Sequence, residues 1–239
     1  MATPLFNAEI VKLRRRLGDL FATDGTEITT ANVESADGSI FKRLELVDIY
    51  NDAVRKQIDY VLSVFPKERW YEYIPGYIFL KTNVSLTSNK YTLSTADPKI
   101  YRVIDVRKYT AGTPAPNELA VEINPAEYFP VSNGLVKTRL PSATSFFWTV
   151  MAEGTAASHI KSLYLLGTIS AVDILYVRQH DDISHGGSVD MDGISTVGLA
   201  HIQLFAESIA RKYKTEEITD LPEIELKNKT EFDLMINKK

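Results

Sequence analysis

Residues 70–82, WYEYIPGYIFLKT, mark the point where the chain changes from a helical to an extended pattern. Upstream of Pro75-Gly76, apolar residues recur at the spacing of an amphipathic helix. Downstream, from Tyr77 to about His180, the period falls to two, and short runs of β-branched and aromatic residues alternate with turn residues. The break therefore predicts an α+β protein in which helices precede a region of strands.

The N-terminal segment predicts a first helix with a basic face. Thr3 and Pro4 suit a helix start, and the apolar residues that follow at helical spacing are Phe6, Ile10, Leu13, Leu17 and Leu20. The opposite face carries Lys12, Arg14, Arg15, Arg16 and Asp19. Consecutive arginines on a helix fan over about 200°. At most two of the three can therefore share a face. We expect the run to be solvated and to pair with acids of a neighbouring helix or subunit or, as an alternative, to contact DNA.

A second helix is predicted from about Phe41 to Phe65, where Pro66 ends it. Its expected buried stripe consists of Leu44, Val47, Asn51, Val54, Ile58, Val61, Leu62 and Phe65. Asn51 is the one polar member of that stripe. The stretch from Thr23 to Ser39, which separates the two helices, shows no apolar period, and a long segment of that kind is usually functional or mobile.

The middle of the chain predicts seven or eight short strands. We place them at Tyr77–Thr82, Lys90–Leu93, Ile100–Tyr109, Glu118–Ile123, Gly134–Leu140, Ser145–Met151, Ile160–Leu166 and Val172–Arg178. Asn133-Gly134 is a hairpin-turn dipeptide. Strands that follow one another without intervening helices favour an antiparallel sheet or small sandwich over βαβ units.

Helix returns near the C-terminus. Its expected stripe is Ile194, Gly198, Ile202, Phe205, Ile209 and Tyr213. We therefore predict a helical bundle from residues 1–75 and 181–219, an inserted β domain at residues 76–180, and a C-terminal extension at residues 220–239.

Composition narrows the functional classes. The 239 residues include 27 basic and 31 acidic side chains, a net charge of −4, and no cysteine. A net-negative chain is not an obvious binder of nucleic acid or anionic membrane, and the lack of cysteine excludes disulfides and thiolate metal sites. The first residues show no export signal, and no apolar run is long enough for a transmembrane helix.

One segment invites a catalytic or metal-binding interpretation. His180, Asp182 and His185 are the weak candidate metal ligands, since imidazoles and carboxylates bind divalent cations. Their spacing fits no helix-borne zinc motif and no EF-hand, so we interpret the segment as a solvated loop. His201 lies on or beside the stripe of the last helix, where we expect a packed histidine. No nucleophile elbow or phosphate-binding glycine loop is present, so we expect neither an enzyme nor a cofactor.

Four segments in succession resemble a known family. They are the helix Leu46–Arg55, which contains Tyr50-Asn51-Asp52-Ala53; the strands Tyr91–Leu93 and Ile100–Arg107; the strand pair Lys161–Gly167 and Val172–Arg178; and the alanine-containing helix Val197–Tyr213 with its charged tail. This order is similar to that of the head-to-tail adaptor (neck or connector) proteins of tailed bacteriophages, especially short-tailed ones. The chain differs from the smaller adaptors in the Thr23–Ser39 insertion and in a larger β region.

The resemblance implies a structural protein of the virion, made in the bacterial host cytoplasm and located at the junction of head and tail. A homo-oligomeric ring of about twelve copies would dock on the portal protein, meet other neck or tail proteins and extend the channel through which DNA passes without specific binding. It would involve no membrane. The residues expected at contacts with neighbouring subunits or the portal are Arg14, Arg15, Arg16, Asn51, Pro222, Ile224, Leu226, Phe232, Leu234 and Met235.

Two other interpretations stay open. A tail or fibre accessory protein with a β-rich binding module would concentrate its function in residues 77–180. A metal-dependent enzyme would be centred on His180 and His185, and elemental analysis of the purified protein would test it.

Overall fold

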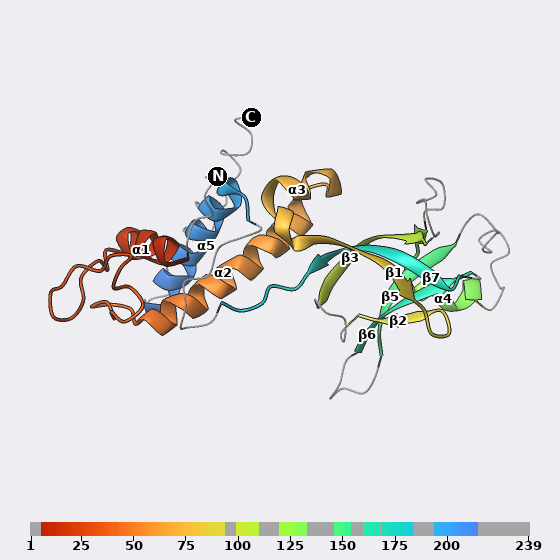
Figure 1. Ribbon diagram of the computed structural model, residues 1–239, viewed down its shortest axis with the longest axis horizontal. Helices are drawn as coiled ribbons and strands as arrows, with labels where there is room; N and C mark the ends of the chain where they lie inside the picture. Colours follow the sequence, from red (N-terminus) through yellow and green to blue (C-terminus); the bar gives the residue numbers. More distant parts are fainter. Residues whose placement is uncertain are drawn as a thin grey trace. The chain divides into compact units, whose positions relative to one another are not determined.

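The protein has a mixed α+β fold. The structure, a computed structural model, describes residues 6–93, 99–109, 120–132, 146–153, 160–167, 169–183 and 194–214. These residues form five α-helices and seven strands, and the strands are arranged in two sheets (Figure 1). The chain divides into two compact units, Met1–Gly76 with His180–Lys239, and Tyr77–Gln179.

The first unit is helical. Its long helices are α1 (Phe6–Leu17), α2 (Arg43–Val64) and α5 (Thr196–Lys214), and the short α3 (Trp70–Tyr73) follows α2 after a single 3-10 turn at Lys67–Arg69. Helix α5 packs against both α1 and α2 (Figure 1). The side chains that fill this core are almost fully buried and include Phe6, Ile10, Leu13, Leu46, Tyr50, Val54, Val61, Ile202 and Ala206. Residues far apart in the sequence thus share one hydrophobic core.

The three predicted helices are present, but two members of the predicted stripes are wrong. Leu44 is 53% exposed and Tyr213 is 65% exposed. Both lie in a terminal turn, Leu44 at the start of α2 and Tyr213 at the end of α5. A side chain at the end of a helix can keep the helical spacing and still project beyond the neighbouring helix, which explains both exceptions.

The second unit contains both sheets. Strands β1 (Ile78–Ser85), β7 (Ala171–Arg178) and β3 (Ile100–Lys108) form an antiparallel sheet in the order β1-β7-β3. Strands β2 (Lys90–Thr92), β6 (Ile160–Leu166), β5 (Phe147–Glu153) and β4 (Val121–Glu122) form the other, in that order. Both sheets contribute to one hydrophobic cluster, which contains Val84, Leu93, Val103, Val106, Trp148, Leu163, Leu165, Val172, Ile174 and Tyr176.

The region between β3 and β5 differs from the prediction. The strand expected at Glu118–Ile123 is only two residues long, and it pairs with β5 in parallel, whereas we expected antiparallel pairing. A helix that we did not predict, α4 (Pro125–Ser132), follows it. Asn124 caps this helix, because its side-chain oxygen accepts from the Ala126 amide at 2.9 Å. The cap, with proline at the first helical position, was a readable helix signal. The strand expected at Gly134–Leu140 and its Asn133-Gly134 turn lie outside the described residues.

Candidate functional site

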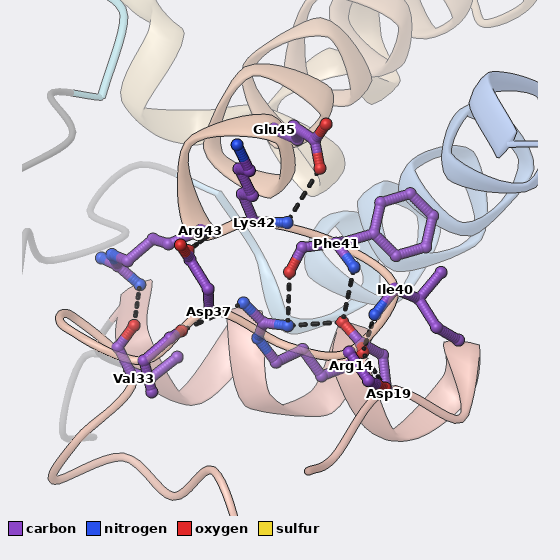
Figure 2. A network of polar contacts seen from close by, with 11 residues as sticks. Arg14, Asp19, Val33, Asp37, Ile40, Phe41, Lys42, Arg43 and Glu45 are labelled. Atoms are coloured by element: carbon purple, nitrogen blue, oxygen red, sulfur yellow. Dashed lines mark hydrogen bonds and ion pairs between the residues drawn. The ribbon is translucent and has the colours of Figure 1, made fainter. Parts of the chain in front are cut away.

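The connection between α1 and α2, residues 18–42, contains a dense network of polar contacts. Figure 2 shows its centre, where Arg14 of α1 points into the connection and meets Asp19. The two side chains form an ion pair of 2.5 Å, and both are fully buried. A buried ion pair is stable only when hydrogen bonds satisfy its remaining donors and acceptors, so the surroundings of the pair decide its role.

Those surroundings are supplied mainly by the backbone of the connection. The Asp19 carboxylate also accepts hydrogen bonds from the backbone amides of Ile40 at 2.8 Å and Phe41 at 3.2 Å. Arg14 donates to the carbonyls of Phe41 at 3.1 Å and Ala36 at 3.3 Å. The pair therefore holds the last part of the connection against the end of α1 (Figure 2).

Arg43, in the first turn of α2, anchors the middle of the connection. Its guanidinium donates to the carbonyl of Val33 at 3.3 Å and to the side-chain oxygen of Asn7 at 3.0 Å. Its backbone amide donates to the Asp37 carboxylate at 2.8 Å. Asn7 in turn donates to Glu34 at 2.7 Å. Contacts to one side of α1, at Asn7 and Arg14, thus fix the connection at two points.

The expectation that Arg14 lies on a solvated helix face is wrong. Its side chain is fully buried, and this burial lowers its pKa below the ordinary value, while Asp19 acts in the opposite direction. A readable signal existed in the sequence: Arg14 stands four residues after Ile10, a member of the predicted apolar stripe. Asp19, the missed partner, had no such signal, because it follows the end of the helix.

The stretch from Thr23 to Ser39 also has more structure than its lack of an apolar period suggested. Ile28 and Val33 are buried, and antiparallel bridges join Phe21 to Glu27 and Ala22 to Gly38. Gly38 packs so closely on the Arg14–Asp19 pair that any side chain there would overlap both of them. The segment is therefore a packed loop that depends on the buried ion pair.

The other two arginines of the basic run remain accessible. Arg15 and Arg16 are exposed. Arg16 pairs with Glu207 of α5 at 3.2 Å, and Glu207 also pairs with Arg211 at 2.9 Å. The run thus divides by function: one arginine holds a loop from inside, and two lie at the surface.

Asn51 holds the segment through which the chain returns to the helical unit. Its side-chain oxygen accepts from the Ile183 amide at 2.9 Å and faces His180 Nε2 at 3.1 Å, and its amide nitrogen donates to the Ile183 carbonyl at 3.2 Å. The polar interruption of the α2 stripe therefore has an intrachain role: it clamps residues 180–183 to α2.

The weak metal candidates are engaged in other contacts. His180 faces Asn51, and Asp182 forms an ion pair with Arg55. His185 lies outside the described residues. In the part of the chain that the structure describes, no group of three or more histidine or acidic side chains is arranged to hold a metal ion.

His201 is packed, as its position beside the α5 stripe indicated. It is fully buried, its ring stacks on Tyr73 with centroids 6.1 Å apart, and Gln57 donates to its Nδ1 at 3.4 Å. Burial lowers its pKa from 6.5 to about 4. The imidazole is therefore neutral near pH 7 and serves packing between α2, α3 and α5.

The predicted contact residues in the C-terminal extension are Pro222, Ile224, Leu226, Phe232, Leu234 and Met235, and they lie outside the described residues. Of the helices that the structure does describe, none combines the length and the apolar character needed to cross a membrane. The chain matches no model of a known protein family and no curated protein sequence.

Proposed function

We propose that this protein is a head-to-tail adaptor of a tailed bacteriophage. In this role it forms a ring below the portal, extends the DNA channel and joins the capsid vertex to the tail. The α+β fold then takes a specific form, in which the helices from both ends of the chain make a bundle and the β unit is an insertion in it.

The observation that carries the proposal is the position of Asn51. It belongs to Tyr50-Asn51-Asp52-Ala53, the most distinctive sequence feature shared with the adaptors. In this chain the same residue binds His180 and Ile183, where the chain leaves the β unit and leads toward α5. A polar residue in a buried stripe is costly unless it is hydrogen-bonded. In a chain whose helical unit is interrupted by a β unit, the asparagine of this motif can hold the returning segment against α2.

Charge supports the same role. The chain carries a net charge of −4. Affinity for DNA comes largely from neutralised phosphates, so a ring of net-negative subunits can surround DNA and still let it slide.

The decisive test is the native mass of the purified protein, measured alone and after mixing with assembled portal from the same phage. The proposal expects the portal complex to gain the mass of a ring of copies. A stable oligomer that ignores the portal would contradict the adaptor role and favour another ring of the neck or tail. A protein that stays monomeric in both samples would favour the accessory binding module.

A truncation gives a second, independent measurement. A chain that ends at residue 219 lacks the apolar extension, which we expect to meet neighbouring subunits or the portal. The proposal expects the truncated protein to keep its fold, as judged by circular dichroism, and to lose assembly on the portal. Unchanged assembly would contradict a role for the extension.

A further inference from the structure

The helical unit presents two exposed features of opposite charge. The first is the tip of the α1–α2 connection, residues 21–27, here called the hairpin tip. The Ala22 amide donates to the Thr26 carbonyl at 2.8 Å, and the Gly25 amide donates to the Ala22 carbonyl at 2.9 Å. Gly25 has a φ of +83°, which glycine adopts without strain. The tip is therefore a closed turn with a defined shape.

The hairpin tip combines apolar and acidic side chains. Phe21 is 55% exposed, and the Ser39 amide donates to its carbonyl at 3.0 Å, which brings the 45%-exposed Ile40 close in the same loop. Asp24 and Glu27 are exposed at the turn, and within the described residues neither forms an ion pair. Residues 20–41 as a whole contain four acids and no base. Exposed apolar residues rimmed by polar side chains are typical of a binding surface.

The second feature is the cationic face. It consists of Lys12, Arg15 and Arg16 on α1 and Arg211 and Lys212 at the end of α5, all of them exposed. The Arg211 guanidinium donates to the Arg16 carbonyl at 3.4 Å, so the two helices form one surface. Among the described residues, two acids partly neutralise it: Glu207, which pairs with Arg16 and Arg211, and the buried Glu9, which pairs with Lys12. The face keeps a positive excess.

The two features lie on different sides of α1. The connection is fixed to Asn7 and Arg14, which share one side of the helix because they are seven residues apart. Arg15 and Arg16 are turned away from Arg14 by about 100° and 200°. The acidic hairpin tip and the cationic face thus lie on different sides of the same chain. This arrangement suits a contact in which the tip of one copy meets the face of another.

We propose that copies of this chain associate head to tail, with the hairpin tip of one copy seated on the cationic face of the next. Phe21 and Ile40 bury apolar surface in this contact, and Asp24 and Glu27 pair with Arg15, Arg16 and Lys212. Because the two patches differ, the contact is heterologous, and such contacts form a ring when the rotation from one copy to the next closes and an open filament when it does not. As an account of the ring, the inference rests on the proposed adaptor function, but the contact itself can be tested separately.

The test uses charge reversal in the full chain. One variant carries Asp24→Lys and Glu27→Lys in the hairpin tip, and another carries Arg15→Glu and Arg16→Glu in the cationic face. Each places like charges together, and we expect at least about tenfold weaker self-association for each. Mixing the two variants pairs reversed tips with reversed faces and should restore assembly. The control, Glu68→Lys with Asp181→Lys, makes the same charge change as the tip variant at two other exposed sites of the helical unit.

Native mass is measured for each protein with and without portal rings, and circular dichroism checks the fold. Loss in both variants with recovery on mixing supports the contact, and the recovery cannot come from misfolded chains. Variants that assemble like the wild type overturn the contact. If the variants assemble like the wild type and the wild type forms a ring on the portal, the contact is wrong but the adaptor function remains supported. If the protein self-associates in a charge-dependent way but does not bind portal rings, the contact is supported and the adaptor function is overturned. A wild type that is monomeric in every sample overturns both.

Discussion

At the scale of single residues, the protein uses charge in its interior where water cannot reach. Arg14 and Asp19 are fully buried, yet each has backbone partners besides the other. Their geometry matters more than their attraction, because the cost of removing water from two charges offsets much of the Coulomb gain. The pair is better understood as a device that fixes the loop than as a source of net stability.

The first prediction compares neighbouring arginines. Arg14→Ala leaves Asp19 buried without its cation, and we expect the free energy of unfolding to fall by about 3–5 kcal/mol. Arg15→Ala, at an exposed position of the same helix, should change it by less than about 0.5 kcal/mol. Urea unfolding measures both. Similar values for the two variants would mean that the Arg14 side chain reaches water.

The second prediction concerns pH. Folded His201 has a pKa of about 4 against 6.5 when unfolded, so between these values the unfolded chain binds more protons. Stability therefore rises with pH. The contribution is complete above about pH 6.5 and is lost as pH falls toward 4, by up to about 3 kcal/mol.

The variant His201→Gln keeps a polar side chain that does not titrate in this range. Unfolding free energies from pH 7 to pH 4.5 should fall less steeply for this variant than for the wild type. Equal slopes would show that His201 gains its proton in the folded protein as easily as in the unfolded chain.

At the scale of elements, the position of α5 depends on the close approach of Gly198 to the backbone of Tyr73 in α3. Ser195 caps the helix, since its hydroxyl accepts from the Gly198 amide at 3.0 Å. A Cβ at Gly198 would lie 2.6 Å from the Tyr73 carbonyl oxygen and 2.7 Å from a methyl of Ile194. The start of α5 can therefore lie against α3 only because residue 198 has no side chain.

The third prediction follows from this contact. Helix propensity alone would make Gly198→Ala stabilising by about 1 kcal/mol. Because the backbone must move to admit the methyl group, we expect instead a loss of about 1–3 kcal/mol. Thermal and urea unfolding give the sign directly. A more stable variant would contradict the close approach of α5 to Tyr73.

The fourth prediction concerns the clamp between α2 and the returning chain. Asn51→Leu fits the apolar stripe but removes the acceptor for the Ile183 amide and the donor to its carbonyl. We expect that amide to exchange its hydrogen at least about tenfold faster. Ser63→Ala, which changes an exposed residue near the end of the same helix, is the control. Unchanged protection of Ile183 would mean that other contacts hold residues 180–183.

At the scale of the whole molecule, each unit keeps its own core. The β cluster draws all its members from residues 84–176, within one continuous segment. The helical core combines residues from both sides of that segment, such as Phe6 and Ile202. The β unit is therefore continuous in the sequence. The helical unit is complete only when α5, which follows the β unit, has packed against α1 and α2.

The fifth prediction tests this difference. Residues 77–179 expressed alone should fold and show one cooperative urea transition, because a continuous segment of this size that contains its own core can fold independently. Circular dichroism with urea titration measures it. A fragment that is unfolded in buffer would show that the β unit needs the helical unit.

The class of fold, and the points where helix gives way to strand and strand to helix, could be predicted from the sequence alone. Hydrophobic period identified α1, α2, α5 and most strands, because each of these elements buries one side against the rest of its unit. It also singled out Asn51, since a polar residue in an apolar stripe stands out without any structure. The helix at Pro125–Ser132 was readable from its cap and was missed.

The partners of the charged residues could not be predicted without the fold. Arg14, Arg15 and Arg16 are identical in chemistry and adjacent in sequence, yet Arg14 is buried with Asp19 while Arg15 is exposed. The parallel pairing of β4 with β5 was equally hidden. The reason is physical. The spacing of apolar residues along an element shows which of its sides is buried. The partner of a charged side chain or of a strand edge depends instead on contacts made by distant parts of the chain.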